Sequence, residues 1–195
     1  MKIYLASKSP RRKELLTQMD VIFDLLLIDT PEIIAPNETP EMYSMRVTKE
    51  KLDAAWEEII RGKLPVMPVL CADTEVVLYG SILGKPRDDQ DAFDMLKSCS
   101  GRNHQVITSV GVNWFDYQKV VMNKTTVTFA HLSDADITHY LSTGNHKDKS
   151  GSYGIQSYIG QFISKIDGCF YSVMGLPLNT VRELLLDLKQ QINAE

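Results

Sequence analysis

Segments with the pattern of strands alternate with segments with the pattern of helices along the whole chain, and this order limits the folds open to it. Apolar runs rich in β-branched residues predict strands at 2–6, 66–72, 76–79, 81–83, 104–112 and 120–129, with two more flanking 167–168. Apolar residues at helical spacing predict helices from residue 10 onward, at 41–61, at 88–97, from 133 to about 144, and at 179–190. This interspersed order predicts an α/β protein.

Residues suited to helix ends support three of these boundaries. Ser9 followed by Pro10 is typical of an N-cap and a first helical position. Ser133, with Asp136 three residues later, predicts a second helix start. Gly101 is suited to the end of the helix before it, because glycine tolerates the left-handed conformation found there.

Size and charge narrow the class of protein. The chain has 195 residues, 44% of them hydrophobic, which favours one globular domain over residues 1–195. Its formal net charge of -4 argues against a nucleic-acid partner, because such binding depends largely on cationic contacts to phosphates.

The cysteines and the apolar segments bear on the compartment. Three cysteines without a CxxC motif indicate neither a disulfide framework nor a zinc site. The apolar run after Met1 is too short for a signal peptide, and no other stretch is long enough to span a bilayer. We therefore expect a soluble, cytoplasmic protein without a membrane partner.

The first predicted strand leads into a basic turn, SKSPRRK, which places Arg11, Arg12 and Lys13 in the first turn of a helix. A helix N-terminus carries partial positive charge, so cations are unfavourable there unless an anion lies among them. Replacing either arginine with alanine is therefore expected to leave the helix at least as stable. Backbone N–H groups, the guanidinium groups and the hydroxyls of Ser7 and Ser9 together would cradle a polyphosphate. A solvated basic turn on a surface helix is the alternative.

Carboxylates suggest a second part of the same site. Asp73 and Thr74 follow the apolar run 66–72, so we expect them just beyond the end of a strand. In open α/β sheets, ligands gather at the carboxyl ends of strands, where a carboxylate can hold Mg²⁺ or orient water. An Asx turn would give the same pattern. Glu32 and Glu75 are further candidate carboxylates.

Two lysines and a late glycine-spaced loop complete the candidates. Lys51 and Lys85, the latter within LGKP, offer ammonium groups that can neutralise phosphate, although each could be an ordinary surface lysine. Residues 148–156, DKSGSYGIQ, suit a loop that approaches a ligand closely, with an ordinary connection as the alternative. The four histidines show no metal-ligand spacing, and no Walker A, HExxH, GxSxG or GxGxxG motif occurs.

Four ordered motifs make the chain resemble the Maf family. The family pattern is a leading SxSPRRxELL, a central ADT, a GKP loop and a late DKAGAYGIQ. This chain has SKSPRRKELL from Ser7, ADT from Ala72, GKP from Gly84 and DKSGSYGIQ from Asp148, so the match spans nearly the whole sequence. The resemblance implies an elongated α/β fold related to the inosine triphosphatase group, in which a mixed sheet with flanking helices forms two lobes around a central cleft.

The resemblance also implies roles for individual residues. Asp73 is expected to act as general base or metal ligand, and Glu32 to be the second carboxylate of the metal site. A divalent metal, Mg²⁺ or Mn²⁺, is implied as the cofactor, and a homodimer as a possible assembly. The residues expected to bind the substrate, from the motifs and the resemblance together, are Ser7, Ser9, Arg11, Arg12, Lys51, Thr74, Lys85 and Gln156.

Three of these residues bear on the base of the nucleotide. The chain is similar to the family branch that prefers UTP and dTTP in having Arg11, Thr74 and Gln156, where the branch resembling 7-methyl-GTP hydrolases has Trp, Gln and Glu. It departs from the family pattern at Ser150 and Ser152, where alanines are usual, and at Ser157, where glycine is usual. Serine at 157 would restrict the backbone and could alter the base preference.

The implied activity is hydrolysis of a nucleoside triphosphate to its monophosphate and pyrophosphate, which would clear unwanted nucleotides from the pool. UTP and dTTP are the expected substrates, with CTP or modified pyrimidine nucleotides as further candidates. Two alternatives stay open: a phosphatase that removes the terminal phosphate, and a non-catalytic nucleotide-binding regulator, for instance of cell division. The identity of the product separates the three.

Overall fold

A computed structural model describes residues 1–194 of the chain, which form one mixed sheet and the helices around it. The strands are β1 (Lys2–Leu5), β2 (Ile22–Leu25), β3 (Val69–Leu78), β4 (Ser81–Ile82), β5 (Asn103–Trp114), β6 (Tyr117–Phe129) and β7 (Ile163–Asp167). The helices are α1 (Pro10–Gln18), α2 (Pro40–Arg61), α3 (Asp89–Cys99), α4 (Asp134–Ser142), α5 (Phe170–Met174) and α6 (Leu178–Ala194), with 3-10 helices η1 (Ser150–Ser152) and η2 (Tyr158–Phe162). The α/β class predicted from the sequence is confirmed.

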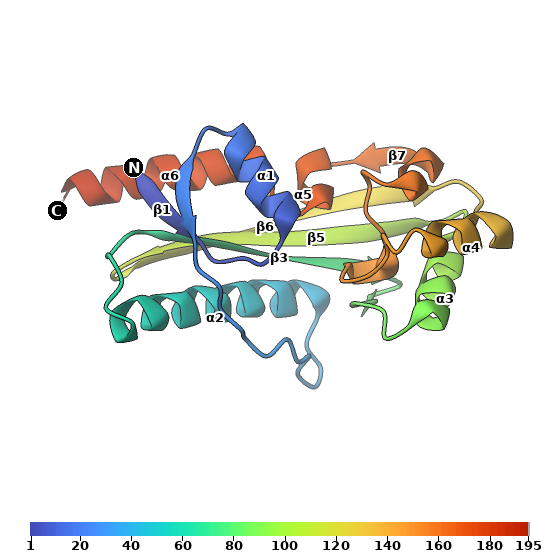
Figure 1. The fold of residues 1–195 in the computed structure, drawn as a ribbon, viewed down its shortest axis with the longest axis horizontal. Coiled ribbons are helices and arrows are strands. Elements are labelled where there is room, and N and C mark those ends of the chain that lie inside the picture. The colour runs from blue at the N-terminus through green and yellow to red at the C-terminus, as the bar shows by residue number, and fades with distance from the viewer. Residues whose placement is uncertain (195) are drawn as a thin grey trace.

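The sheet order is β2-β1-β3-β5-β6-β7, with β4 paired to the end of β3. β1 runs parallel to β2 and β3, whereas β3, β5, β6 and β7 run antiparallel to one another in that order. The long strands β5 and β6 extend through most of the molecule and account for its elongated shape (Figure 1).

β3 has one incomplete edge, and this gap locates the predicted site. On one side, β5 accompanies β3 from Val69 to Val77. On the other side, β1 pairs with β3 only as far as Leu70, and β4 pairs with it from Val77 onward. Within residues 1–194, no strand covers that edge between these two points, and Asp73 lies in the middle of the gap.

Apolar side chains pack on both faces of the sheet, because successive side chains of a strand point to opposite faces. Leu5 and Leu70 join a core closed by α1 and α6, whereas Tyr4 and Val69 join a core closed by α2 (Figure 1). A third core lies at the other end of the sheet, where α3, α4 and η2 cover the ends of β3, β5 and β6. The two ends of the molecule therefore have separate cores, as the two lobes implied by the resemblance require.

The capping predictions are confirmed. The side chain of Ser9 accepts a hydrogen bond from the N–H of Arg12 at the start of α1, and Pro10 is the first helical residue. Ser133 and Asp136 form a reciprocal capping box at the start of α4. Gly101, directly after the C-cap of α3, has a φ of +67°, which glycine adopts without strain. Caps are local features, which explains why the sequence alone reveals them.

Several strand predictions are wrong. The strand expected at 66–72 starts at Val69 and continues to Leu78, so Asp73 lies inside β3 and not beyond its end. Polar residues are tolerated inside this strand because side chains from α1, α2 and η1 supply their partners. The second late strand, expected after residue 168, is helix α5. The sequence does not predict β2, whose largely exposed side chains give no alternating apolar pattern.

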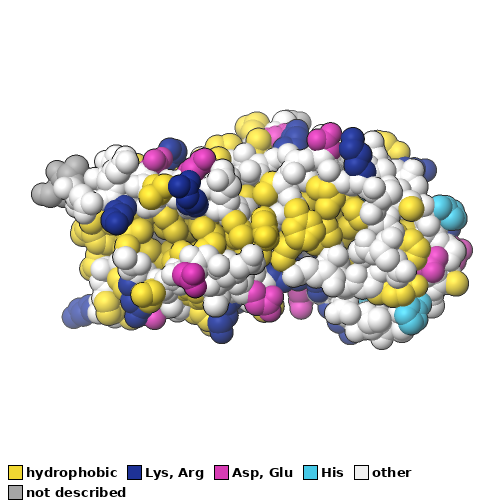
Figure 2. Space-filling view, turned by 90° about the horizontal axis from the view of Figure 1, so that it is seen from above, with side chains coloured by type: hydrophobic (Ala, Val, Ile, Leu, Met, Phe, Trp, Pro, Cys, Tyr) yellow, Lys and Arg dark blue, Asp and Glu magenta, His cyan; other side chains and the backbone are white. Residues whose placement is uncertain are grey.

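One face of the described chain carries a band of apolar side chains (Figure 2). Figure 2 shows apolar side chains gathered in a band along the middle of the face seen from above.

Among residues 1–194, no helix combines the length and the apolar character needed to cross a membrane. The single domain predicted over residues 1–195 stays a prediction, and its last residue lies outside the described range.

His104 is a titratable group inside the core at the far end of the sheet. It is 2% exposed, its Nε2 atom lies 2.7 Å from the hydroxyl of Tyr153, and its ring lies against that of Phe129. Burial lowers the pKa of His104 to about 4, from an ordinary value of 6.5. The folded protein therefore holds His104 in its neutral form at neutral pH.

Acidification should destabilise the protein through His104. Between pH 6.5 and about 4 the unfolded chain binds a proton at this residue that the folded protein does not, so stability falls as the pH falls. The loss attributable to His104 should approach roughly 3 kcal/mol by pH 4. Urea unfolding of wild type and His104→Gln over this range measures it, with exposed His131→Gln as the control. Parallel pH profiles for wild type and His104→Gln would contradict this assignment.

Candidate active site

Asp73 lies in the gap at the β3 edge and is 4% exposed. Its Oδ1 atom lies 2.6 Å from Nζ of Lys51, which α2 places on the same face of the sheet. Its Oδ2 atom is buried and has no hydrogen-bond partner within residues 1–194. Because a buried carboxylate oxygen without a partner is unfavourable, this atom is suited to receive a ligand.

Lys51 connects Asp73 to a second carboxylate, Glu32. Glu32 lies on the strap, which we define as residues 26–39 between β2 and α2. Its Oε1 atom lies 2.6 Å from Nζ of Lys51, and its Oε2 atom lies 3.2 Å from Nζ of Lys85. Burial disfavours the charged forms, but the ion pairs outweigh it, so the pKa of Glu32 is lowered and the pKa of Lys51 is raised. The structure thus brings these four predicted residues together.

Arg46 of α2 fastens the strap. Its Nε atom lies 2.6 Å from Oε1 of Glu38, and its Nη2 atom donates to the carbonyl oxygen of Ile33 at 2.9 Å. Arg46 also pairs with Glu50, one turn further along α2. Because Ile33 directly follows Glu32, these contacts help to hold the Glu32 carboxylate beside Lys51.

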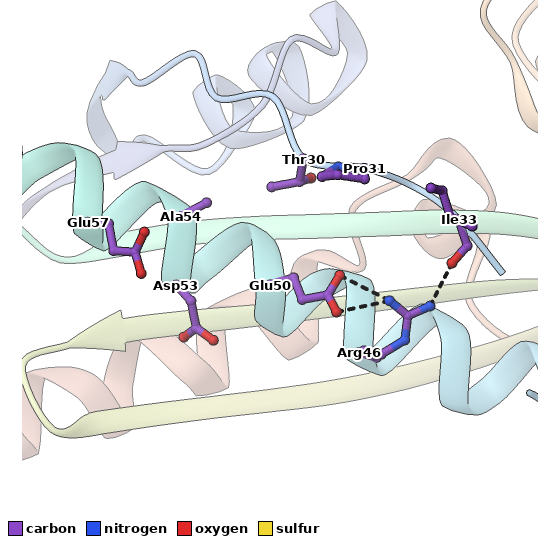
Figure 3. A pocket seen from close by; sticks show the side chains of 8 residues that line it. All are labelled: Thr30, Pro31, Ile33, Arg46, Glu50, Asp53, Ala54 and Glu57. Carbon is purple, nitrogen blue, oxygen red and sulfur yellow. Dashed lines mark hydrogen bonds and ion pairs between the residues drawn. The ribbon is translucent and has the colours of Figure 1, made fainter. Parts of the chain in front are cut away.

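A groove of about 460 Å³ lies between the strap and α2 (Figure 3). Its walls include Arg46 and the carboxylates of Glu50, Asp53 and Glu57, all from α2. The carboxylates would repel a polyphosphate, and Arg46 already has carboxylate partners. This groove therefore does not suit the predicted ligand, and the candidate site is the cluster at the β3 edge.

Arg12 reaches the same stretch of β3 from α1. Its Nη2 atom donates to Oγ1 of Thr74 at 3.0 Å, and its Nε atom donates to the carbonyl oxygen of Gly175 at 2.9 Å. A longer contact of 3.5 Å joins Nη1 to Oγ of Ser7. Burial lowers the pKa of Arg12, and the charge of Asp73 opposes this shift. Arg12 therefore ties α1 to β3 and to the end of α5, besides presenting a cation near Asp73.

The two serines of the basic turn are engaged mainly with the turn itself. Ser7 Oγ accepts from the N–H of Ser9 at 3.1 Å, and Ser9 Oγ accepts from the N–H of Arg12 at 3.4 Å. Each hydroxyl still has a proton to donate. The two serines therefore shape the basic turn from within, and its role as a phosphate cradle stays a prediction.

Arg11 and Gln156 stand apart from these contacts. Arg11 is partly buried on α1, and both burial and the neighbouring charge of Arg12 lower its pKa. Lys149, in the late loop of residues 148–157, also has a lowered pKa, from burial and then from the charge of Arg11. Gln156 is exposed in the turn between η1 and η2. The charges of Arg11 and Lys149 thus disfavour each other, and an anion near both would relieve this.

Glu75, named from the sequence as a further candidate carboxylate, lies close to Asp73. It lies two positions after Asp73 on β3, on the same face, and is 7% exposed. Burial and then the negative charge of Asp73 raise the pKa of Glu75 to about 8. The alternation of a strand through residues 73–75 would have indicated this position, but the sequence prediction ends the strand before it.

The carboxylates fit the predicted metal. Within residues 1–194, no group of three or more His, Cys, Asp or Glu side chains is arranged to hold a metal ion. Mg²⁺ usually keeps several waters and takes only one or two protein carboxylates together with substrate phosphates. The unpartnered Oδ2 atom of Asp73, with Glu32 nearby, suits that mode of binding. The metal itself stays a prediction.

Fold and site together define an α/β protein with a buried cluster of carboxylates and cations at an open sheet edge. Residues 2–188 match the family model described as Maf-like protein, and the chain belongs to this family. The resemblance stated from the four motifs is therefore confirmed.

Named relatives agree over nearly the full length. The chain is similar to a protein of Aliivibrio fischeri named dTTP/UTP pyrophosphatase, with 46% identity over 183 residues, which is 94% of this chain and 96% of that protein. Proteins of the same name from Photobacterium profundum and Dechloromonas aromatica are 46% and 40% identical, over 91% and 95% of this chain and 92% and 96% of their own lengths.

The two arginines of the basic turn should differ in their effect on stability. Arg12→Ala removes hydrogen bonds to Thr74 and to the Gly175 carbonyl, and should destabilise the protein by about 2 kcal/mol. Arg11→Ala, the matched control, should stay within about 0.5 kcal/mol of wild type, as the sequence alone predicts for both. Urea unfolding measures the difference. Equal stabilities of the two variants would contradict a structural role for Arg12.

Proposed function

We propose that this chain is a nucleoside triphosphate pyrophosphatase that hydrolyses dTTP and UTP to the monophosphate and pyrophosphate. Membership of the Maf family and the names of the relatives support this activity. The observation that carries it is the buried Oδ2 atom of Asp73, which has no partner within residues 1–194, in a carboxylate that pairs with Lys51 of α2 through Oδ1. CTP or modified pyrimidine nucleotides are further candidate substrates, and the activity would clear such nucleotides from the pool.

The residues of the cluster suit attack of water on a phosphoanhydride. Negative charge builds up on the phosphates as the bond breaks, and Arg11, Arg12 and Lys85 would stabilise it. Asp73 would orient the attacking water and accept its proton. Mg²⁺ or Mn²⁺, held by Asp73 and Glu32, would supply charge neutralisation and a lower pKa of the water.

Lys51 has a separate part in this proposal. In the absence of substrate it partly offsets the charges of Asp73 and Glu32, since Nζ lies 2.6 Å from an oxygen of each. A phosphate entering the gap would offer it a further anionic partner. Lys51 would thus keep the two carboxylates apart and charged before the substrate binds, and hold the substrate afterwards.

The two other candidate functions differ in product. A phosphatase that removes the terminal phosphate would release orthophosphate, and a non-catalytic regulator would release nothing. The relatives' names favour the pyrophosphatase over the regulator. Pyrophosphate release measured on a nucleotide panel with Mg²⁺ or Mn²⁺ tests the proposal, and orthophosphate alone or no product would overturn it.

The setting of the activity is also part of the proposal. The enzyme would act in the cytoplasm, would not bind nucleic acid, and would form a homodimer. Light scattering of the purified protein tests the dimer.

Asp73→Asn should remove most of the activity while the protein stays folded. The change keeps the side-chain volume but removes the negative charge and the proton acceptor, so we expect kcat to fall by roughly a hundredfold or more. Asp116→Asn, in the exposed turn between β5 and β6, is the matched control and should leave kcat unchanged. Pyrophosphate release and circular dichroism of both variants measure this. A kcat near wild type in Asp73→Asn would exclude Asp73 from the chemistry.

Gln156 is proposed to read the base, and Gln156→Glu tests this. Uracil and thymine present an N–H between two carbonyl oxygens, and the exposed amide of Gln156 carries both an acceptor and donors to match it. Loss of the donors should reduce kcat/KM for UTP and dTTP by about tenfold to a hundredfold, with little change in Tm. The measurement is kcat/KM for UTP, dTTP, CTP, GTP, ATP and 7-methyl-GTP. A wild-type preference for 7-methyl-GTP would overturn the pyrimidine assignment and direct attention to Ser157.

A further inference from the structure

Glu75 is a buried carboxylate that the proposed reaction does not use. It is 7% exposed and lies on the same face of β3 as Asp73. Within residues 1–194 it forms no ion pair, because the nearby ammonium of Lys51 is shared by Asp73 and Glu32. Burial of a carboxylate is unfavourable unless hydrogen bonds compensate for the lost water. The one side-chain hydrogen bond that Glu75 receives in this part of the chain is therefore informative.

That hydrogen bond comes from Ser150, at the start of η1. Ser150 Oγ donates to Oε2 of Glu75 at 3.0 Å and accepts from the backbone N–H of Val76 at 3.0 Å. A hydroxyl has a single proton to donate, so the two contacts together fix its orientation as well as its position. At Val76, Ser150 takes the place that a neighbouring strand would take on the open edge of β3.

The next residue docks the late loop at the same point. Gly151 has a φ of +66°, and a Cβ atom there would lie 2.7 Å from Cβ of Val76. Its N–H donates to the carbonyl oxygen of Gly84 at 2.7 Å, in the segment that carries Lys85. The late loop therefore lies directly on β3 at one side and on the Lys85 segment at the other.

The residues on either side of Ser150 include candidates for contact with the proposed substrate. Lys149 precedes it and packs along Gly154, where a Cβ atom would lie 3.0 Å from Cε of the lysine. Gln156 follows six residues later, in the exposed turn. A displacement of Ser150 would move both side chains relative to Asp73.

We propose that Glu75 and Ser150 form a latch that sets the position of the late loop against β3, and thereby the position of the nucleotide beside Asp73. Both act as positioning residues, since each works through the loop and not through contact with the nucleotide. The kinetic consequence of the latch rests on the proposed function. The attachment of the loop to β3 does not.

Ser150→Ala tests the latch by leaving Glu75 and the Val76 N–H without their partner. KM for UTP should rise about tenfold while kcat changes by less than about threefold. Amide hydrogen exchange of residues 150–155 should become about tenfold faster. Ser152→Ala is the matched control, because its buried hydroxyl lies in the same loop but donates to Sδ of Met95. Wild-type KM and exchange in Ser150→Ala would overturn the latch.

Glu75→Gln distinguishes a positioning role from direct contact with metal or substrate. Glutamine has nearly the same volume and keeps a carbonyl oxygen that accepts the hydrogen bond from Ser150. We therefore expect KM, kcat and loop exchange within about twofold of wild type. A tenfold or greater loss of kcat with unchanged loop exchange would show that Glu75 acts on the reacting groups, and would overturn its assignment as part of a latch.

A double-mutant cycle with Glu75→Val measures the coupling between the two residues. Because both changes remove the same hydrogen bond, the double variant with Ser150→Ala should raise KM no more than the more affected single variant. Additive increases in KM would overturn the latch. If the wild type releases no pyrophosphate from any nucleotide, the proposed function fails, whereas hydrogen exchange of the late loop still decides on the latch.

Discussion

The ammonium group of Lys51 lies between two carboxylates, and the arrangement of the β3 edge depends on it. Asp73 is buried in the sheet and Glu32 arrives on the strap, so their charges would repel each other without a cation between them. Breaking a buried ion pair from one side typically costs about 3–5 kcal/mol, because the other charge is left uncompensated. The same helix supplies Arg46, which fastens the strap. One helix, α2, thus positions both carboxylates of the candidate site.

At the start of α1, a contact with the end of α5 offsets the unfavourable placement of a cation, Arg12, at a helix N-terminus. Cations at a helix N-terminus oppose the helix dipole. Arg12, however, donates to the carbonyl oxygen of Gly175, which is the C-cap of α5 and has a φ of +108°. Carbonyl groups at a helix end carry partial negative charge, so the guanidinium lies against a favourable partner. Within residues 1–194 Arg11 has no such contact, which leaves its charge available for an anion.

Features fixed by neighbouring residues were predictable from the sequence, and features fixed by distant contacts were not. The caps at Ser9 and Ser133 depend on a few adjacent residues, and the alternation of elements was enough for the α/β class. The extent of β3 depends on partners from far along the chain, so Asp73 was expected beyond a strand that in fact continues past it. Glu75 and Ser150 are separated by 75 positions in the sequence, so no local pattern predicts their contact. Of the predicted site residues, Asp73, Glu32, Lys51 and Lys85 lie together through ion pairs, and Arg12 contacts Thr74 through a hydrogen bond.

The unpaired stretch of β3 also bears on how the protein avoids edge-to-edge aggregation. An open strand edge offers free backbone groups to which a strand of another chain can add. Here the exposed length is short, since β1 covers it up to Leu70 and β4 resumes at Val77. A strand that added to it would also have to displace Ser150, which already accepts a hydrogen bond from the N–H of Val76. The late loop that lies on this edge therefore makes it a poor template for aggregation.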